Sequence, residues 1–169
     1  MLIKSVRGFT PKYGRDCFFA ENATLIGEVL LGDECSVWYQ AVVRGDVNAI
    51  TIGDRVNIQD GAVIHGTYER SATAIGNDVS IGHNAVVHGC IIKDSVLVGM
   101  GSIIMDDSVV ESNSIIAAGS VLPKNTIVPA GSVFAGVPAK KIKEINPELQ
   151  KGEVERIAKN YLTYASWFK

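Results

Sequence analysis

Three histidines are the side chains of this sequence best suited to chemistry, and the chain has no others. His83 and His88 stand five residues apart in SIGHNAVVHG, and His65 lies upstream in NIQDGAVIHG. Neutral imidazole nitrogens are good ligands for Zn²⁺ and also suit Fe²⁺ and Co²⁺. Three of them around one ion leave a fourth position open, as in a catalytic metal site. Whether one chain can bring all three together depends on the elements that carry them.

Those elements are predicted by an aliphatic repeat. Eleven of the thirteen steps between successive members are six residues long, and the other two are eleven and five. A helix favours steps of three and four and a half-buried strand alternates by two, so neither explains a period of six. The period is typical of a hexapeptide solenoid, in which each hexad gives a strand and a corner and three hexads close one coil. The members are Ile52, Ile58, Ile64, Ile75, Ile81, Val87, Ile92, Val98, Ile104, Val110, Ile116, Leu122, Val128 and Phe134.

The pattern changes character after about Ala135. Asn146 and Pro147 suit the cap and first position of a helix, and apolar residues then follow at helical spacing. We therefore predict a mainly β fold in a single domain spanning 1–169, with a parallel β-helix over about 10–140. A C-terminal helix over about 147–167 packs along its outside. The segment GTYERSATA (66–74) interrupts the repeat and is predicted to leave the coil as a short loop.

Hexad counting fixes where the histidines lie. His65 and His88 each follow a core aliphatic directly, so they occupy one outward-facing column on adjacent coils, about 4.8 Å apart. Arg44 belongs to the same column one coil earlier. His83 lies near a corner, stacked on Asp60, and about 15 Å of extended chain separates it from His88. One chain is therefore expected to offer His65 and His88 to a metal, but not His83.

A second subunit can supply the missing histidine. If two prisms associate side by side, the face with His65 and His88 meets the corner that carries His83 of the partner subunit. Three equivalent contacts of this kind close into a ring. We therefore expect a homotrimer with one metal ion, Zn²⁺ or alternatively Fe²⁺ or Co²⁺, at each subunit interface.

Composition excludes several partners and compartments. The 16 basic and 18 acidic side chains nearly cancel, so we expect no nucleic acid and no anionic membrane as partner. No apolar run approaches the roughly 20 residues of a membrane helix, and the N-terminal residues have no secretory h-region. Cys17, Cys35 and Cys90 are odd in number and form no CxxC pair. They are predicted to be reduced thiols, which places the protein in the cytoplasm.

The segments SVWYQAVVRGDVNAITIGDRVNIQDGAVIHG and IGNDVSIGHNAVVHGC closely resemble the γ-class carbonic anhydrases and their relatives of similar length. The resemblance covers roughly residues 8–140, and its specific motifs are RGD, NIQDG and three histidines in matching order. It implies a trimer of left-handed β-helices that hydrates CO₂ reversibly to bicarbonate. It also implies that His65 and His88 bind the metal from one subunit and His83 from the neighbour.

Roles for further residues follow from the same resemblance. Gln59 is expected to hydrogen-bond metal-bound water or bicarbonate. The Arg44–Asp46 pair is expected to form a salt-bridge network with Asp60 across the subunit interface. Tyr161, on the C-terminal helix, resembles a family tyrosine that approaches the pocket.

Two departures from the family pattern argue against fast turnover. The most active members carry a glutamate directly after the aspartate of the RxD motif, where this chain has Val47. They also carry a proton-shuttling glutamate in an acidic loop, which here is a short segment with only Glu69. Two alternatives therefore stay open: a non-catalytic metal-binding or assembly subunit, and a hexapeptide acyltransferase with a histidine base and a CoA thioester. Against the acyltransferase, all three histidines fit the metal pattern, which leaves none as a base.

Overall fold

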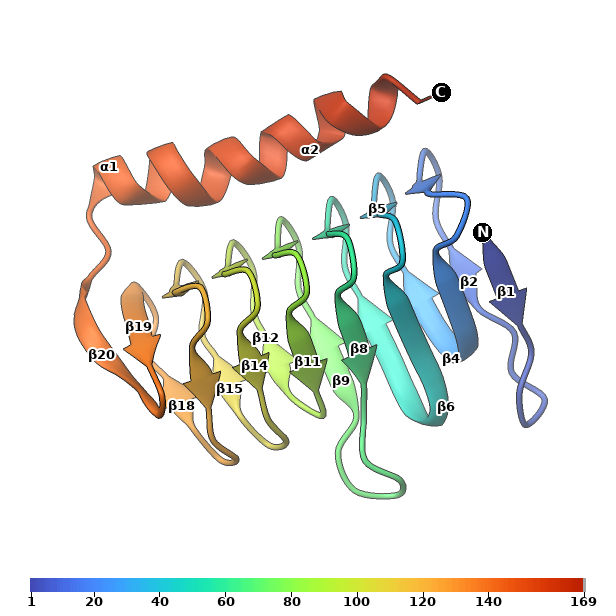
Figure 1. Ribbon diagram of the computed structural model, residues 1–169, viewed down its shortest axis with the longest axis horizontal. Coiled ribbons are helices and arrows are strands. Elements are labelled where there is room, and N and C mark those ends of the chain that lie inside the picture. Colours follow the sequence, from blue (N-terminus) through green and yellow to red (C-terminus); the bar gives the residue numbers. More distant parts are fainter. Residues whose placement is uncertain (169) are drawn as a thin grey trace.

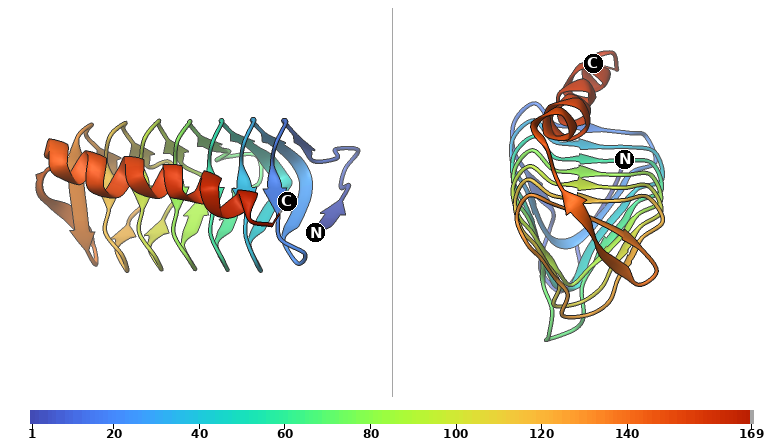
Figure 2. Two further views of the ribbon diagram at one scale, coloured as in Figure 1. Left: turned by 90° about the horizontal axis from the view of Figure 1, so that it is seen from above. Right: turned by 90° about the vertical axis from the view of Figure 1, so that its left-hand side faces the viewer.

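The computed structural model describes residues 1–168 and shows a parallel β-solenoid with a C-terminal helix along one side (Figure 1). Seen end on, the coils stack as a rounded triangle (Figure 2). Followed from the N-terminus they wind in a left-handed sense, the hand that the resemblance implied. The predicted mainly β fold with one C-terminal helix is thus confirmed.

The first side of the triangle lies beneath the helix and is called the helix face. Its sheet has eight strands, and all but the last are parallel. The strands are β3 (Phe18–Phe19), β5 (Ser36–Val37), β7 (Asn57–Ile58), β10 (Ser80–Ile81), β13 (Leu97–Val98), β16 (Ile115–Ile116), β19 (Ser132–Gly136) and the antiparallel β20 (Ala139–Glu144).

The second and third sides share one twelve-stranded sheet, because β4 (Thr24–Leu31) and β6 (Val42–Ile52) run round the corner between them. The second side, called the histidine face, carries β8 (Val63–His65), β11 (Val86–His88), β14 (Ile103–Ile104) and β17 (Val121–Leu122). The third side carries β2 (Lys12–Tyr13), β9 (Thr73–Ile75), β12 (Ile91–Ile92), β15 (Val109–Val110) and β18 (Ile127–Val128), and β1 (Leu2–Lys4) pairs with the start of β4.

The core consists of the hexad aliphatics, stacked coil on coil. Ile58, Ile81 and Val98 form such a column on the helix face and have no exposed surface. Burying one side chain of this size contributes about 1.5–3 kcal/mol. Because no coil covers its own aliphatics at both ends, this burial depends on the neighbouring coils. The corners turn through residues in the left-handed region, such as Asp107 and Asn125 with φ of 60° and 62°.

The C-terminal helix begins where the sequence predicts. The Asn146 side-chain oxygen accepts a hydrogen bond from the Leu149 backbone N–H at 2.8 Å, which caps α1 (Pro147–Leu149). The helix continues as a wider π-helical segment over Gln150–Glu155 and then as α2 (Arg156–Ser166). Two features were not predicted: the π-helical segment and β20, which leads the chain from the last coil to the helix.

The predicted loop is present between β8 and β9, where residues 66–72 project from the coil (Figure 1). Thr67 and Ser71 form a backbone bridge across its base. Within residues 1–168, no helix is long and apolar enough to cross a membrane.

Candidate metal centre

His65 and His88 lie side by side on the histidine face. They are paired in the register of β8 and β11, as hexad counting predicts. Nδ1 of His65 and Nε2 of His88 are 3.2 Å apart. Two nitrogens bound at about 2.0–2.1 Å to one tetrahedral zinc ion would be about 3.3–3.4 Å apart. The two rings therefore already hold nearly the separation that a shared metal needs.

The outer nitrogen of each ring contacts a carboxylate. Nε2 of His65 lies 2.9 Å from Oδ1 of Asp46, and Nδ1 of His88 lies 2.8 Å from Oδ1 of Asp106. Ionised carboxylates only accept hydrogen bonds, so each outer nitrogen must carry the proton. In the neutral rings the two facing nitrogens then both present lone pairs. Two lone pairs 3.2 Å apart need a cation between them, either a proton or a metal ion.

Both carboxylates are held in the ionised form. Burial alone would raise the pKa of Asp46, but hydrogen bonds from His65 and Arg44 outweigh it and the pKa lies below its ordinary value. For Asp106, burial is likewise outweighed by hydrogen bonds from Thr67, His88 and Lys124, and the pKa is lowered. Ionised carboxylates on the outer nitrogens are the usual support for metal-binding imidazoles.

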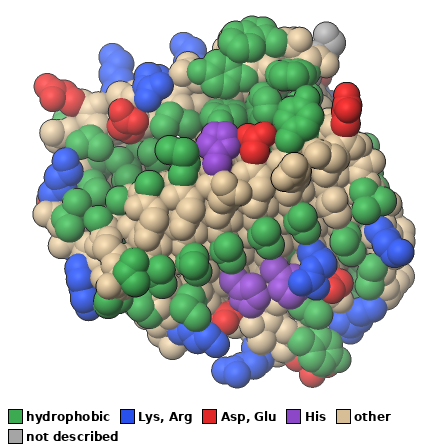
Figure 3. Space-filling view, viewed as in Figure 1, with side chains coloured by type: hydrophobic (Ala, Val, Ile, Leu, Met, Phe, Trp, Pro, Cys, Tyr) green, Lys and Arg blue, Asp and Glu red, His purple; other side chains and the backbone are tan. Residues whose placement is uncertain are grey.

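His83 lies apart from this pair. Figure 3 shows two histidines together along one edge of the histidine face and the third at the opposite edge, below the helix. Nδ1 of His83 lies 2.9 Å from Oδ2 of Asp60, its predicted stacked neighbour. Nε2 lies 3.4 Å from the Tyr161 hydroxyl. His83 thus repeats the pattern of the other two rings, with a carboxylate on one nitrogen.

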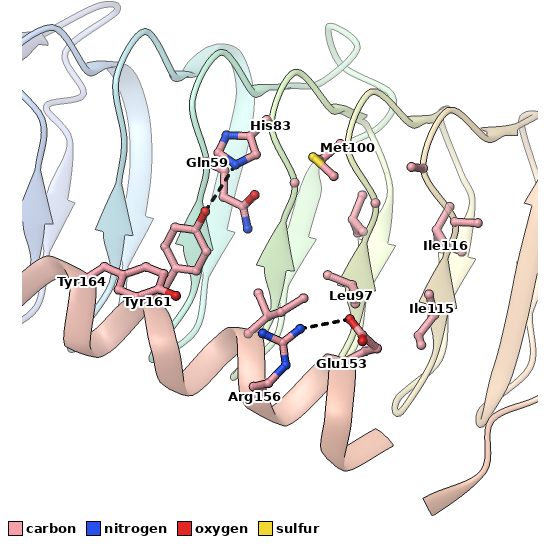
Figure 4. Close-up of a pocket in the computed structure, with 16 residues that line it drawn as sticks. Gln59, His83, Leu97, Met100, Ile115, Ile116, Glu153, Arg156, Tyr161 and Tyr164 are labelled. Carbon is pink, nitrogen blue, oxygen red and sulfur yellow. Dashed lines mark hydrogen bonds and ion pairs between the residues drawn. The ribbon is translucent and has the colours of Figure 1, made fainter. Parts of the chain in front are cut away.

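A cavity of about 440 Å³ adjoins His83 beneath the helix (Figure 4). Gln59 and Tyr161 line it together with His83. Gln59 is 5% exposed, and its amide nitrogen donates to the Asn57 side-chain oxygen at 2.9 Å. Burial, followed by the negative charge of Asp60, raises the pKa of Tyr161 to about 12, so its hydroxyl stays protonated at neutral pH. Aliphatic side chains from β13 and β16 line one wall of the cavity, and the C-terminal helix adds residues that include the charged Glu153 and Arg156.

The predicted site residues therefore fall into two groups. Arg44 and Asp46 join His65 and His88, since the Arg44 guanidinium donates to Oδ2 of Asp46 at 2.5 Å. Asp60, Gln59 and Tyr161 join His83. Among residues 1–168, no three His, Cys, Asp or Glu side chains are arranged so that they could hold one metal ion. This division within one chain is the one that hexad counting predicts, and the expected contact of Asp60 with Arg44 and Asp46 lies between subunits, so it stays a prediction.

Sequence reasoning missed Asp106. Its side chain lies over Gly89, where an added Cβ would come within 2.3 Å of Oδ1, so only glycine leaves room for it. A signal was present in the sequence. Asp106 follows the core aliphatic Ile104 by two residues, as Asp60 follows Ile58, and both carboxylates contact a histidine.

Comparisons with known proteins agree with this architecture. The model of the family described as "Bacterial transferase hexapeptide (six repeats)" matches residues 89–124. The chain is 36% identical to a carbonic anhydrase of Geobacillus kaustophilus, covering 99% of this chain and 91% of the relative. It is 46% identical to a protein of Methanocaldococcus jannaschii named "Probable carbonic anhydrase", covering 86% of this chain and 88% of the relative.

Among solved structures, a hexapeptide transferase family protein from Anaplasma phagocytophilum is 38% identical, with a TM-score of 0.94. The match covers 99% of this chain and 98% of that one. The shared fold is thus complete, from the first coil to the C-terminal helix. With relatives named carbonic anhydrase matching over nearly their whole length, the chain belongs to the γ-carbonic-anhydrase-like family of hexapeptide-repeat proteins.

Proposed function

We propose that this protein hydrates CO₂ reversibly to bicarbonate at a divalent metal held between the subunits of a homotrimer. One observation carries the proposal: each of the three histidines has a carboxylate on one ring nitrogen, so the other nitrogen carries the lone pair that a metal would need. For His83, metal binding would replace the long contact with the Tyr161 hydroxyl. The relatives named carbonic anhydrase support the same activity.

The residues present fit a metal with three imidazole ligands. His65 through Nδ1 and His88 through Nε2 would hold the ion from one subunit, because these nitrogens face each other. Nε2 of His83 of the partner subunit would be the third ligand. This donor set suits Zn²⁺, with Fe²⁺ or Co²⁺ as alternatives. When bound, such an ion supplies Lewis acidity, which makes water a nucleophile at neutral pH.

The other residues orient and support. Gln59 is held by its hydrogen bond to Asn57, and we assign to it the orientation of water or bicarbonate beside His83. Asp46, paired with Arg44, fixes the ring of His65, and in the proposed trimer Arg44 and Asp46 would meet Asp60 of the partner subunit. Tyr161 keeps its proton and directs its hydroxyl towards His83.

The proton that hydration releases has few acceptors near the paired histidines. Val47 stands beside Asp46, where a glutamate would offer a carboxylate. Glu69, on the loop, lines a surface depression together with Asp46 and Val47. We therefore propose slower hydration than in family members with both glutamates, because Val47 replaces one of them and the short loop offers only Glu69 in place of the other.

The proposal is tested by metal analysis and CO₂ hydration on the same samples. Protein purified anaerobically without chelator should carry close to one divalent ion per chain, and zinc- or iron-loaded protein should hydrate CO₂ in a stopped-flow assay. The matched control is His65→Ala/His88→Ala, which should bind no metal and lose the rate. Metal-free wild type that cannot be loaded would contradict the metal site. A loaded protein without hydration at neutral and alkaline pH would support an assembly subunit.

A second candidate is a hexapeptide acyltransferase, favoured by the transferase names of the family model and of the Anaplasma structure. Its substrate would be a CoA thioester bound between subunits. CoA binding measured by calorimetry separates the two, because a carbonic anhydrase has no need to bind it.

A cytoplasmic location remains part of the proposal and is consistent with the reduced thiols expected of the three cysteines.

A further inference from the structure

We propose that Asp106 is a positioning residue with two roles. It fixes which nitrogen of His88 faces the metal, and it links the loop 66–72 to the histidine pair, His65 and His88. The inference rests on the proposed metal site and deepens it. It concerns a buried carboxylate that lies one coil beyond His88 and receives hydrogen bonds from three directions.

The contacts of Asp106 are specific. Its side chain is 9% exposed. Oδ1 lies 2.8 Å from Nδ1 of His88 and accepts from the Thr67 hydroxyl at 2.9 Å. Oδ2 lies 3.2 Å from the Lys124 ammonium. Gly89 leaves the space that Oδ1 occupies. Because each oxygen is held from another part of the chain, the carboxylate has little freedom to rotate away from the ring.

This arrangement selects one tautomer of His88. A neutral imidazole carries its proton on either nitrogen, and the lone pair is on the other. A carboxylate beside Nδ1 favours the proton there, which leaves the lone pair on Nε2, the atom that faces His65. Without Asp106, the ring would divide between both tautomers and would be free to turn. Part of the free energy of metal binding would then be spent on selecting one tautomer and one ring orientation, and the affinity would fall.

The same oxygen ties the loop to the site. Thr67 stands at the base of the loop and shares Oδ1 with His88, so movement of the loop base changes the hydrogen bonding of the carboxylate. The neighbouring residue Asp107 makes a parallel contact, in which its Oδ1 accepts from the Ser71 hydroxyl at 2.7 Å. Among residues 1–168, no hydrogen bond or ion pair joins Asp107 to a histidine. Asp107 is therefore a matched control, because it anchors the loop without a hydrogen bond to His65 or His88.

The experiment compares Asp106→Ala, Asp106→Asn and Asp107→Ala as purified trimers. Zn²⁺ affinity is measured by competition with a chromophoric chelator, after size-exclusion chromatography and circular dichroism have checked assembly and fold. We expect a 10–100-fold loss of affinity for Asp106→Ala, as for other residues that orient metal ligands. Asp106→Asn keeps a neutral acceptor and should lose less. Asp107→Ala should change the affinity by less than about threefold.

A second readout needs no metal. In metal-free protein, ¹⁵N chemical shifts of the histidine rings report which nitrogen is protonated. His88 should carry a full proton on Nδ1 in wild type and in Asp107→Ala, whichever ring holds the proton between the two histidines, and only a partial one in Asp106→Ala. Thr67→Val should keep the tautomer but weaken Zn²⁺ binding by a few fold, because Oδ1 of Asp106 loses one of the two groups that hold it.

The outcomes separate the two levels of the proposal. Wild type that binds no Zn²⁺ overturns the proposed metal site, whatever Asp106 does. Wild type that binds while Asp106→Ala binds equally well, with an unchanged His88 tautomer, overturns the positioning role. Equal losses in Asp106→Ala and Asp107→Ala would show that loop anchoring alone matters, which also overturns it.

Discussion

The two edges of the histidine face are built differently. One edge carries His65 and His88, which come from paired strands of adjacent coils. Their side chains are 17% and 32% exposed. At the helix edge, His83 follows the strand β10 in a turn, and its side chain is 39% exposed beside an equally open Asp60. The first edge is preorganised within one chain. At the second edge, Nε2 of His83 has only the long contact of 3.4 Å to the Tyr161 hydroxyl. One chain therefore brings together two of the three histidines of the proposed metal site.

The largest effect is expected when the histidines of the two edges are placed on different chains. His83→Ala subunits keep the pair, and His65→Ala/His88→Ala subunits keep the helix edge. Each variant alone should retain less than a tenth of the wild-type metal, because every interface lacks at least one ligand. Co-expressed in equal amounts and mixed at random, they should regain metal at about a quarter of the interfaces.

The fraction follows from geometry, since an interface is intact only when an intact pair meets an intact His83. Metal content of the mixed trimers, isolated with two different affinity tags, gives the measurement; because homotrimers are removed, one of the three interfaces in each isolated trimer should hold metal. No recovery in verified mixed trimers would mean that the site is not shared between subunits. Full retention by the His83→Ala homotrimer would mean that the pair alone is sufficient.

A medium effect is expected from the supporting carboxylates. Asp46→Asn removes the charge that holds His65 and pairs with Arg44, and it should weaken Zn²⁺ binding by 10–100-fold. Asp60→Asn acts at the more exposed edge, where solvent competes for the ring, and should weaken binding by less than tenfold. Chelator competition on both variants gives the ratio. A larger loss for Asp60→Asn would reverse the ranking of the two edges.

The smallest effect concerns the helix edge and pH. The pKa of Tyr161 is raised to about 12, mainly by burial. Between pH 10 and 12 the unfolded chain therefore loses this proton more readily than the folded one, and the free energy of unfolding falls as pH rises. Tyr161→Phe should remove this part of the fall. At pH 7 it should cost only about 0.5 kcal/mol, for one long hydrogen bond.

Urea denaturation of wild type and Tyr161→Phe at pH 7 and pH 11 provides the measurement. All other residues are the same in the two proteins, so the difference between them isolates Tyr161. Equal pH slopes would show that Tyr161 ionises alike in the folded and unfolded chains.

Much of the fold followed from the sequence, because the six-residue period gives the position of each residue within its coil. The stacking of His65 on His88, and of Asp60 on His83, depends only on counting residues between buried aliphatics. The start of the helix followed from the local chemistry of Asn146 and Pro147. The assignment of metal and catalytic roles stays a prediction.

Residue counting missed features that depend on the direction of single side chains or lie outside the repeat. Asp106 reaches back over Gly89 towards His88, one coil earlier, and counting places residues in columns without showing such diagonal contacts. Thr67 lies in the loop, where the period is broken, so its contact with Asp106 had no register to predict it. The strand β20 follows the last hexad and pairs antiparallel, outside the repeat.

The stacking of His65 on His88 also makes the coil the unit of tolerated sequence change. Duplicating or deleting a whole coil on the C-terminal side of Asp106 and Lys124 would lengthen or shorten the prism and leave every ring nitrogen in place. One extra coil between His65 and His88 would move the rings apart by a further strand spacing, about 4.8 Å, beyond the reach of one ion. The length of such a protein is therefore free to vary at its end, while the proposed metal site requires that His65 and His88 stay on adjacent coils.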